Sequence, residues 1–236
     1  MQKEQIKHRR RIIELTKEAD TTHIGSALSA VDAIDAVYKV KKQGEKFILS
    51  NGHAAAALYV VLESKGLLKD PKLTELGIHP ERNPLIDIEV STGSLGQGLP
   101  IAVGIALADR SKNTYCCVSV GECAEGSIWE AVSIASKYKL KNLKIIINAN
   151  GYAGYEKIDS EKLIPKFNAF GCDVVDVDGH DIDKIIGALT IDTETPLVVF
   201  ARTVVDQLPF LKGLSAHYYK MTEEDYKLAL ETWSKN

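Results

Sequence analysis

The sequence lacks the features that mark zinc proteins, disulfide-linked secreted proteins and membrane proteins. Its four cysteines show no CxxC pair and no Cys/His spacing, which argues against a zinc site and against a disulfide framework. No apolar stretch reaches membrane-spanning length, and the charged N-terminal segment has no apolar core of the kind found in secretory leaders. These absences predict a soluble protein of the reducing cytoplasm with no membrane partner.

The chain also has no strong excess of charge of either sign. Lysine and arginine number 29 against 32 acidic residues, for a net charge of −3, so nothing suggests a nucleic-acid partner. The one basic cluster, 7–11, falls on an expected helix, where a solvated face is favoured over a binding patch. The length fits one sizeable α/β domain or two small ones. We expect one, 1–236, with N-terminal helices (1–45), a sheet core (about 46–203) and a C-terminal segment (204–236).

Hydrophobic periodicity predicts an α/β fold. Two helices come first, the second starting at a Ser29 cap, and a last helix follows a capping Thr222. Between them, short apolar strands alternate with helices, which is typical of a parallel sheet with helices on both faces. The expected strands are 46–50, 114–120, 143–149, 172–177 and 196–202, and the expected helices between them include 126–138, 160–169 and 181–189.

Two of these strands end in residues that carry oxygen donors. Glu122 follows one strand, and Asn150 follows the next strand 28 residues later. Ligands of open parallel sheets bind beyond the carboxyl ends of the strands, and Mg²⁺ prefers oxygen ligands supplemented by substrate phosphates. The pair therefore suits a metal-bound diphosphate. From spacing alone the favoured interpretation is simpler: Glu122 is a helix N-terminal charge and Asn150 an ordinary turn residue.

Three histidines, His23, His53 and His79, lie in loops or at helix starts in the first third of the chain. Imidazoles there could bind phosphate and transfer protons near neutral pH, although a lone loop histidine is more often an ordinary surface residue. The glycine-rich turn TGSLGQG (92–98) opens a helix and would let backbone amides approach a ligand. Alone, this turn is a weak signal.

Taken in order, these segments resemble the N-terminal, diphosphate-binding domain of transketolases, which are thiamine-diphosphate enzymes. The matching segments run from His23 to about His217, which is most of the chain. They are HIGSALSAVD, FILSNGHAAAALY, HPE, STGSLGQGL, VGECAEGSIWEAVSIASKYKLKNL, NANG and VDGHDI. The resemblance implies the thiamine-diphosphate-binding fold.

The resemblance also implies a role for each matching residue. His53 would contact the cofactor diphosphate. His23 and His79 would face the sugar substrate, and His217 is a further catalytic candidate near the diphosphate. The other expected roles are the aminopyrimidine contacts of Gly93, Ser94 and Leu95, cofactor contacts of Gly121 and Cys123, and metal ligands from Glu122, Asn150 and the carbonyl of Tyr152, the metal being Mg²⁺ or else Ca²⁺ or Mn²⁺.

Two departures from the family pattern affect the expected activity. The family's metal loop is Gly-Asp-Gly, whereas this chain has Gly121-Glu122-Cys123. Glutamate keeps the carboxylate but adds a methylene group to a site with strict geometry, and metal binding could be weakened, retuned or lost. The second departure is length, because a full transketolase has two further domains. The second departure implies that this chain is inactive alone.

The length predicts the N-terminal subunit of a split transketolase, active only with a partner chain that carries the pyrimidine-binding domain. An assembly with a second copy of each chain, α2β2, is expected. The reaction would transfer a two-carbon ketol unit between sugar phosphates or related aldehydes. Two alternatives remain: a subunit of another thiamine-diphosphate carboligase or decarboxylase, and a non-catalytic scaffold with a degenerate metal site.

Overall fold

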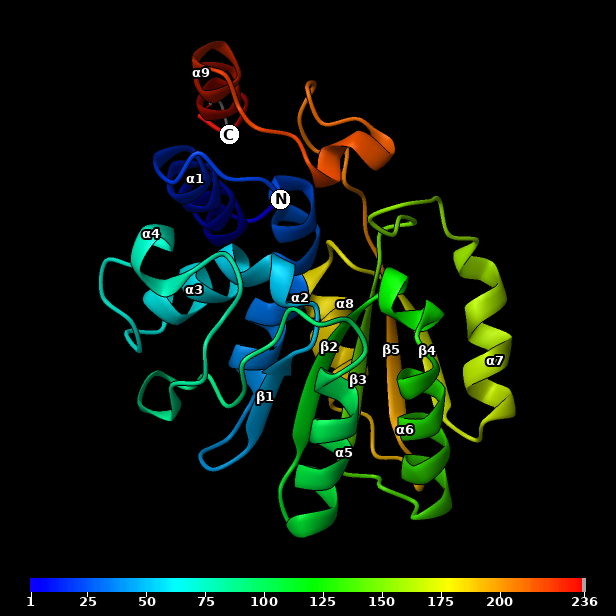
Figure 1. The fold of residues 1–236 in the computed structure, drawn as a ribbon. Helices are drawn as coiled ribbons and strands as arrows, with labels where there is room; N and C mark the ends of the chain where they lie inside the picture. The colour runs from blue at the N-terminus through cyan, green and yellow to red at the C-terminus, as the bar shows by residue number, and fades with distance from the viewer. Residues whose placement is uncertain (235–236) are drawn as a thin grey trace.

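A five-stranded parallel sheet forms the centre of the computed structural model, which describes residues 1–234. The strand order is β1-β2-β3-β5-β4, and every neighbouring pair is parallel. The carboxyl ends of all the strands therefore lie at one edge of the sheet (Figure 1). This confirms the predicted parallel sheet. The strands are β1 (Lys46–Leu49), β2 (Thr114–Ser119), β3 (Leu143–Ala149), β4 (Asp173–Asp178) and β5 (Leu197–Arg202).

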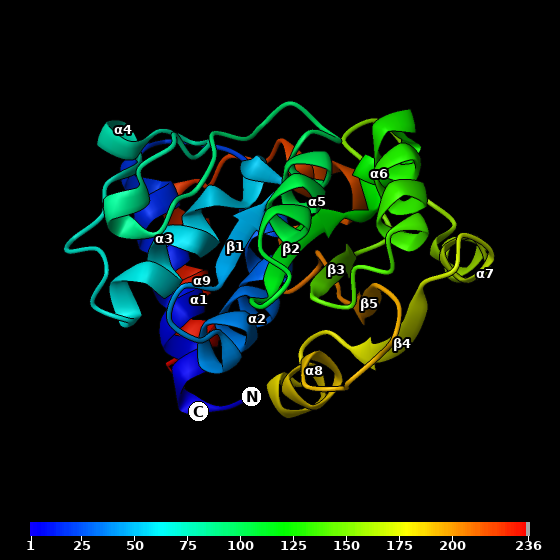
Figure 2. The same ribbon diagram turned by 90° about the horizontal axis from the view of Figure 1, so that it is seen from below.

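Helices cover both faces of this sheet, as Figure 2 shows. On one face lie α2 (Ile24–Val40) and α8 (Ile182–Leu189), and on the other lie α5 (Gly98–Ala108), α6 (Gly126–Lys137) and α7 (Leu163–Ala169). Side chains alternate along each strand, so Ile146 joins one apolar core and its neighbours Ile145 and Ile147 join the other. The two-sided burial explains the run of three isoleucines, 145–147, at the centre of β3.

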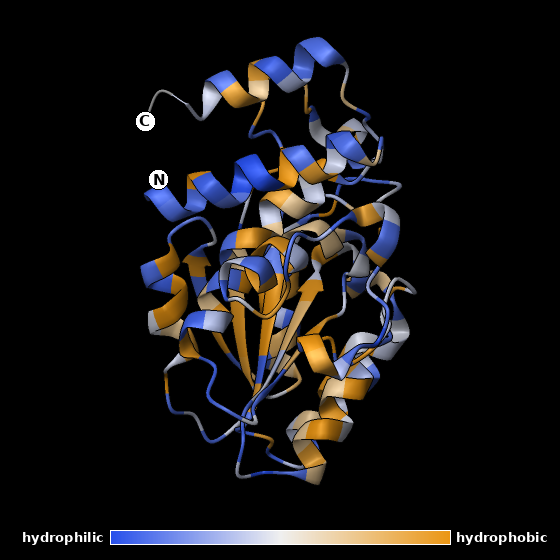
Figure 3. Ribbon diagram, turned by 90° about the vertical axis from the view of Figure 1, so that its left-hand side faces the viewer, coloured by the Kyte–Doolittle hydropathy of each residue, from blue (hydrophilic) through white to orange (hydrophobic). Residues whose placement is uncertain are grey.

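A second layer of helices packs outside α2. It consists of α1 (Lys3–Glu18), α3 (Ala55–Ser64) and α9 (Glu223–Thr232), with a short α4 (Leu73–Leu76) beside them. Thr222 caps α9 as predicted, accepting a hydrogen bond from the Asp225 N–H at 3.1 Å. In Figure 3 the strands are largely hydrophobic, whereas the helices near the two marked termini carry many hydrophilic residues. None of the described helices is long and apolar enough to cross a membrane.

The start of α2 differs from the sequence-based prediction. The helix begins at Ile24, not at Ser29, and His23 precedes it in the left-handed conformation, with φ 68°. Ser29 lies inside the helix, and its hydroxyl donates to the Ser26 carbonyl at 3.0 Å. A serine hydroxyl that bonds back to the preceding turn is compatible with a helix interior, so Ser29 does not mark a helix start.

A buried ion pair joins α1 to α2. Arg9 is fully buried and pairs with Asp32, which also hydrogen-bonds His180 at 2.9 Å. Burial alone would raise the pKa of Asp32, but the hydrogen bonds from Arg9 and His180 lower the pKa to about 2. The pair thus anchors the helical layer to the β4–α8 loop.

Candidate active site

A cavity of about 220 Å³ opens at the carboxyl edge of the sheet, where loops from distant parts of the chain meet. The ends of β2 and β3 form its floor, and the loops around the first histidines and around His217 form its walls. Its lining residues are His23, Ser26, His53, His79, Gly93, Leu95, Ser119, Gly121, Asn150, Tyr152, Ala153, Gly154, Tyr155, His217 and Tyr218.

The loop that contains Gly52, after β1, packs tightly against the loop that contains Gly93 beside this cavity. A Cβ on Gly52 would lie 2.6 Å from the backbone of Thr92, so only glycine allows this approach. Gly93 has a φ of +143°, and a Cβ there would lie 2.9 Å from the His79 ring. The Thr92 hydroxyl also donates to the Leu49 carbonyl at 2.7 Å. These contacts hold His53 and His79 next to the end of β1.

Four imidazoles converge on the cavity from four separate segments. The His23 ring centroid lies 4.6 Å from that of His217, 5.7 Å from that of His53 and 6.0 Å from that of His79. The ring centroids of His53 and His217 are 5.3 Å apart. The backbone N–H of His23 donates to the His217 carbonyl at 3.0 Å, which ties the start of α2 to the C-terminal segment. The structure therefore brings all four predicted histidines together.

The cluster holds its imidazoles in the neutral form. Burial lowers the pKa of His53 to about 3 and that of His23 to about 4, and the neighbouring imidazoles contribute to both shifts. Burial also lowers the pKa values of His79 and His217. At neutral pH each ring thus offers one N–H donor and one acceptor nitrogen.

The end of β3 supplies neutral oxygen donors to the same cavity. Asn150 is buried, its Nδ2 donates to the Ser29 hydroxyl at 3.3 Å, and its Oδ1 accepts from the Tyr152 N–H at 3.1 Å. The Tyr152 carbonyl lies beside Gly121, where an added Cβ would be 3.8 Å from it. Asn150, Tyr152 and Gly121 therefore lie together at this end of the cavity.

Glu122 occupies a different place from the predicted one. It lies in the short 3-10 helix Val120–Ala124, is completely buried, and does not line the cavity. Its Oε1 accepts from the Ser50 hydroxyl at 2.6 Å and the Gly96 N–H at 3.0 Å, and its Oε2 accepts from the Ser119 N–H at 2.8 Å and the Ser119 hydroxyl at 3.2 Å. A metal-ligand role for Glu122 does not fit this geometry, because the 3-10 turn directs the carboxylate back towards β1.

Two other predicted cofactor contacts also lie outside the cavity lining. Ser94 is exposed, and Cys123 is buried with its thiol 3.9 Å from the Ser119 carbonyl oxygen. Conversely, the cavity is lined by residues that the sequence reasoning missed, which are Ser26, Ser119, Ala153, Gly154, Tyr155 and Tyr218. Ser26 lies about one helical turn after His23 and Tyr218 directly follows His217, so their spacing from the histidines could have pointed to them.

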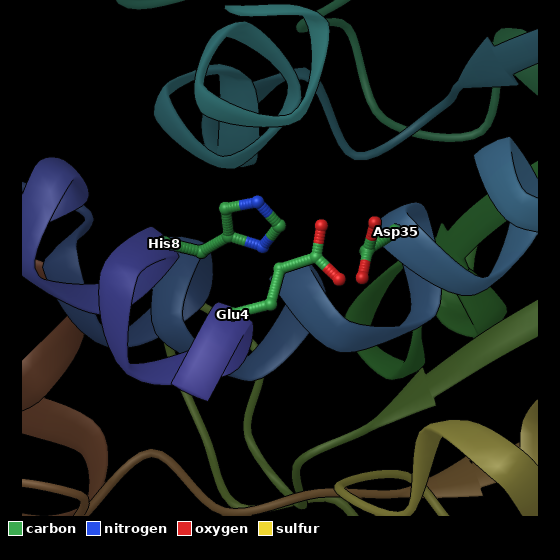
Figure 4. Close-up of side chains that lie close together, drawn as sticks. All are labelled: Glu4, His8 and Asp35. Atoms are coloured by element: carbon green, nitrogen blue, oxygen red, sulfur yellow. The ribbon is translucent and has the colours of Figure 1, made fainter. Parts of the chain in front are cut away.

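A separate cluster of side chains that could ligate a metal ion lies between α1 and α2, as Figure 4 shows. The ligand atoms of Glu4, His8 and Asp35 lie within 4.8 Å of one another. However, the ammonium groups of Lys39 and Lys65 lie 2.8 and 2.9 Å from the Asp35 oxygens. These lysines neutralise the carboxylates, so the cluster is an ion-pair network that joins the helical layer.

The chemistry of the cavity lining fits an anionic ligand. No aspartate or glutamate is among the described residues that line it, whereas imidazole, hydroxyl and amide groups surround the space. The Nδ1 atom of His23 is buried and has no hydrogen-bond partner within the described residues. Buried polar atoms are normally satisfied, so a ligand with oxygen atoms would complete this wall.

Comparison with known proteins confirms the predicted resemblance. A family model described as "Transketolase, thiamine diphosphate binding domain" matches residues 2–233. The chain is 32% identical to an apulose-4-phosphate transketolase subunit from Phocaeicola vulgatus, over 97% of this chain and 92% of that protein. It is 33% identical to the 6-deoxy-6-sulfo-D-fructose transketolase subunit SqwG of Clostridium sp., over 90% of this chain and 88% of that protein.

A solved structure gives the same fold. The transketolase of Campylobacter jejuni matches with a TM-score of 0.86 and 26% identity, and the match covers 98% of this chain. It covers only 42% of that chain. The structure thus corresponds to less than half of that transketolase, whereas this chain matches most of the length of each of the two similar subunits.

Proposed function

Because the chain belongs to the transketolase family, we propose that it is the diphosphate-binding subunit of a two-chain enzyme that uses thiamine diphosphate. Its near-complete coverage of two proteins named as transketolase subunits supports the two-chain arrangement. The partner chain would carry the pyrimidine-binding domain, and an α2β2 assembly would contain two active sites.

The proposed reaction moves a two-carbon ketol unit from a ketose phosphate to an aldehyde. Thiamine diphosphate, when bound, supplies the carbanion chemistry that breaks and forms the carbon–carbon bond. This chain would bind the diphosphate end of the cofactor and present its histidines to the substrate. The proposed substrate class is a sugar phosphate or a related sugar derivative.

The observation that carries this proposal is the convergence of four neutral imidazoles on one cavity. His53, whose pKa is lowered to about 3, would stay neutral and donate its N–H to a diphosphate oxygen. His23 and His79 would face the substrate hydroxyl groups, where a neutral imidazole can accept a proton and return it. Gly93 and Leu95 would contact the pyrimidine ring.

The proposal can be tested with this chain purified together with its partner subunit. We expect thiamine diphosphate to bind the assembly, and a ketose phosphate with an aldehyde acceptor to give ketol transfer. His53→Ala should mainly weaken cofactor affinity, whereas His23→Ala should mainly lower kcat. His8→Ala is the matched control, because His8 lies outside the cavity. No cofactor binding by a stable assembly would contradict the proposal and favour a scaffold role.

A further inference from the structure

The buried position of Glu122 removes the expected carboxylate from the cofactor cavity. All four of its contacts are to groups of this chain, two on each carboxylate oxygen. A metal at this carboxylate would have to replace hydrogen bonds as short as 2.6 Å, and the donors Ser50, Gly96 and Ser119 would then be left unsatisfied in a buried place. Leaving buried donors without an acceptor is unfavourable.

No other described carboxylate replaces Glu122 in the cavity. The remaining oxygen donors at the end of β3 are the Asn150 amide and the Tyr152 carbonyl, and both are neutral. Glu125, the next carboxylate along the chain, is half-buried at the start of α6 and is absent from the lining. The chain therefore presents an uncharged set of ligands to any cation in the cavity.

Magnesium in proteins is usually held by one or two carboxylates together with substrate phosphates. Because this chain places no carboxylate in the cavity, the diphosphate is the anionic ligand that its neutral oxygens would act with. Two neutral oxygens cannot offset the cost of removing water from a small divalent cation, which dehydrates reluctantly. A free cation would thus gain little from entering the cavity alone.

Resting on the proposed function, we propose that this chain binds its divalent cation only as the cation–diphosphate complex, through neutral oxygens, and that Glu122 is a positioning residue. Glu122 joins the end of β1 at Ser50, the glycine-rich loop at Gly96 and the end of β2 at Ser119. These three segments shape the cavity around Gly93 and Leu95. The Glu122 carboxylate therefore holds these three segments together and does not bind the metal.

Mn²⁺ is a suitable probe, because the electron paramagnetic resonance signal of free Mn²⁺ falls when the ion binds protein. The assembly with the partner subunit is titrated with Mn²⁺, first alone and then with saturating thiamine diphosphate. We expect no binding at this site below about millimolar Mn²⁺ without the cofactor and binding at least about tenfold tighter with it. Submillimolar binding to the wild-type assembly without diphosphate would overturn the inference, and its loss in Glu122→Gln would identify Glu122 as the ligand.

The variants separate the metal role from the positioning role. With saturating cofactor, Mn²⁺ affinity in Glu122→Gln should stay within about threefold of the wild type, whereas Asn150→Ala should lose at least about tenfold, as changes around metal ligands commonly do. Glu125→Gln is the matched carboxylate control. A loss of about tenfold in Mn²⁺ affinity in Glu122→Gln, with Glu125→Gln unchanged, would identify Glu122 as a ligand after all.

The titrations also separate this inference from the proposed function. Failure of thiamine diphosphate to bind the wild-type assembly, with or without Mn²⁺, would contradict the proposed function. Cofactor binding accompanied by independent Mn²⁺ binding would leave the function standing and refute only the inference. Because the first titration uses the wild-type chain, the result holds even where Glu122→Gln does not fold.

Discussion

Acidification should destabilise this protein through its histidine cluster. In the folded chain the pKa of His23 is about 4 and that of His53 is about 3, whereas an unfolded histidine titrates near 6.5. Between these values the unfolded chain binds more protons than the folded chain. Stability is therefore full above about pH 6.5 and falls as the pH drops towards about 4.

The magnitude follows from the two pKa values. At about pH 5.5, one unit below the unfolded pKa, an imidazole that stays neutral in the folded state costs about 1.3 kcal/mol. His23 and His53 together should then lower the free energy of unfolding by about 2.5 kcal/mol relative to about pH 7.5. Asp32 does not contribute in this interval, because its pKa of about 2 in the folded state keeps it ionised.

Urea unfolding at the two pH values measures this loss directly. The wild type should lose about 2.5 kcal/mol more than the double variant His23→Asn/His53→Asn, with unchanged m values. The comparison cancels the contribution of His8, whose pKa burial also lowers. An equal loss in both proteins would show that the two imidazoles are not held neutral and would refute the burial argument.

Two substitutions, each with a control substitution, and one labelling experiment test the packing around the site and the core. Gly93→Ala should cost about 1–3 kcal/mol and shift the histidine ring resonances, whereas Gly104→Ala, in the open interior of α5, should stabilise the chain by about 0.5–1 kcal/mol in the same urea assay. Asp32→Asn should cost about 3–5 kcal/mol in chemical unfolding because it leaves the Arg9 charge buried, while Asp20→Asn, at an exposed pair, should change little. All four cysteines are buried with raised thiol pKa values, so a thiol reagent should label them only at the rate of unfolding; rapid labelling of the native chain would contradict their burial.

The sheet could be predicted from sequence because its strands are buried on both faces. A strand with an apolar centre such as residues 145–147 has few alternatives once helices flank it. The start of α2 could not be predicted in the same way. Ser29 is a good capping residue in isolation, but the preceding small residues also pack as helix, and the left-handed conformation of His23 depends on its contact with His217 at the other end of the chain.

Some residues of the site could be predicted from sequence, and others depend on tertiary contacts. The order of the matching segments predicted that His23, His53, His79 and His217 share one site. They lie together because the loops that carry them meet at the same edge of the sheet. Ser119 was missed because a serine at a strand end carries no distinctive signal. Its hydroxyl matters only where it meets the Glu122 carboxylate, a contact that depends on the 3-10 turn.

Glu122 illustrates why spacing predicts the edge of a sheet better than the direction of a side chain. A carboxylate directly after a buried strand must lie near the carboxyl edge, and Glu122 does. Which way it points depends on the one or two residues of the turn. Here Ser119 and Gly121 face the cavity, and Glu122 turns back to close the capping box with Ser119 and to reach Ser50. Burial raises the pKa of Glu122, and the four hydrogen bonds that its oxygens accept offset only part of this desolvation, so contacts within the chain, and not the spacing along the sequence, set the direction of this side chain.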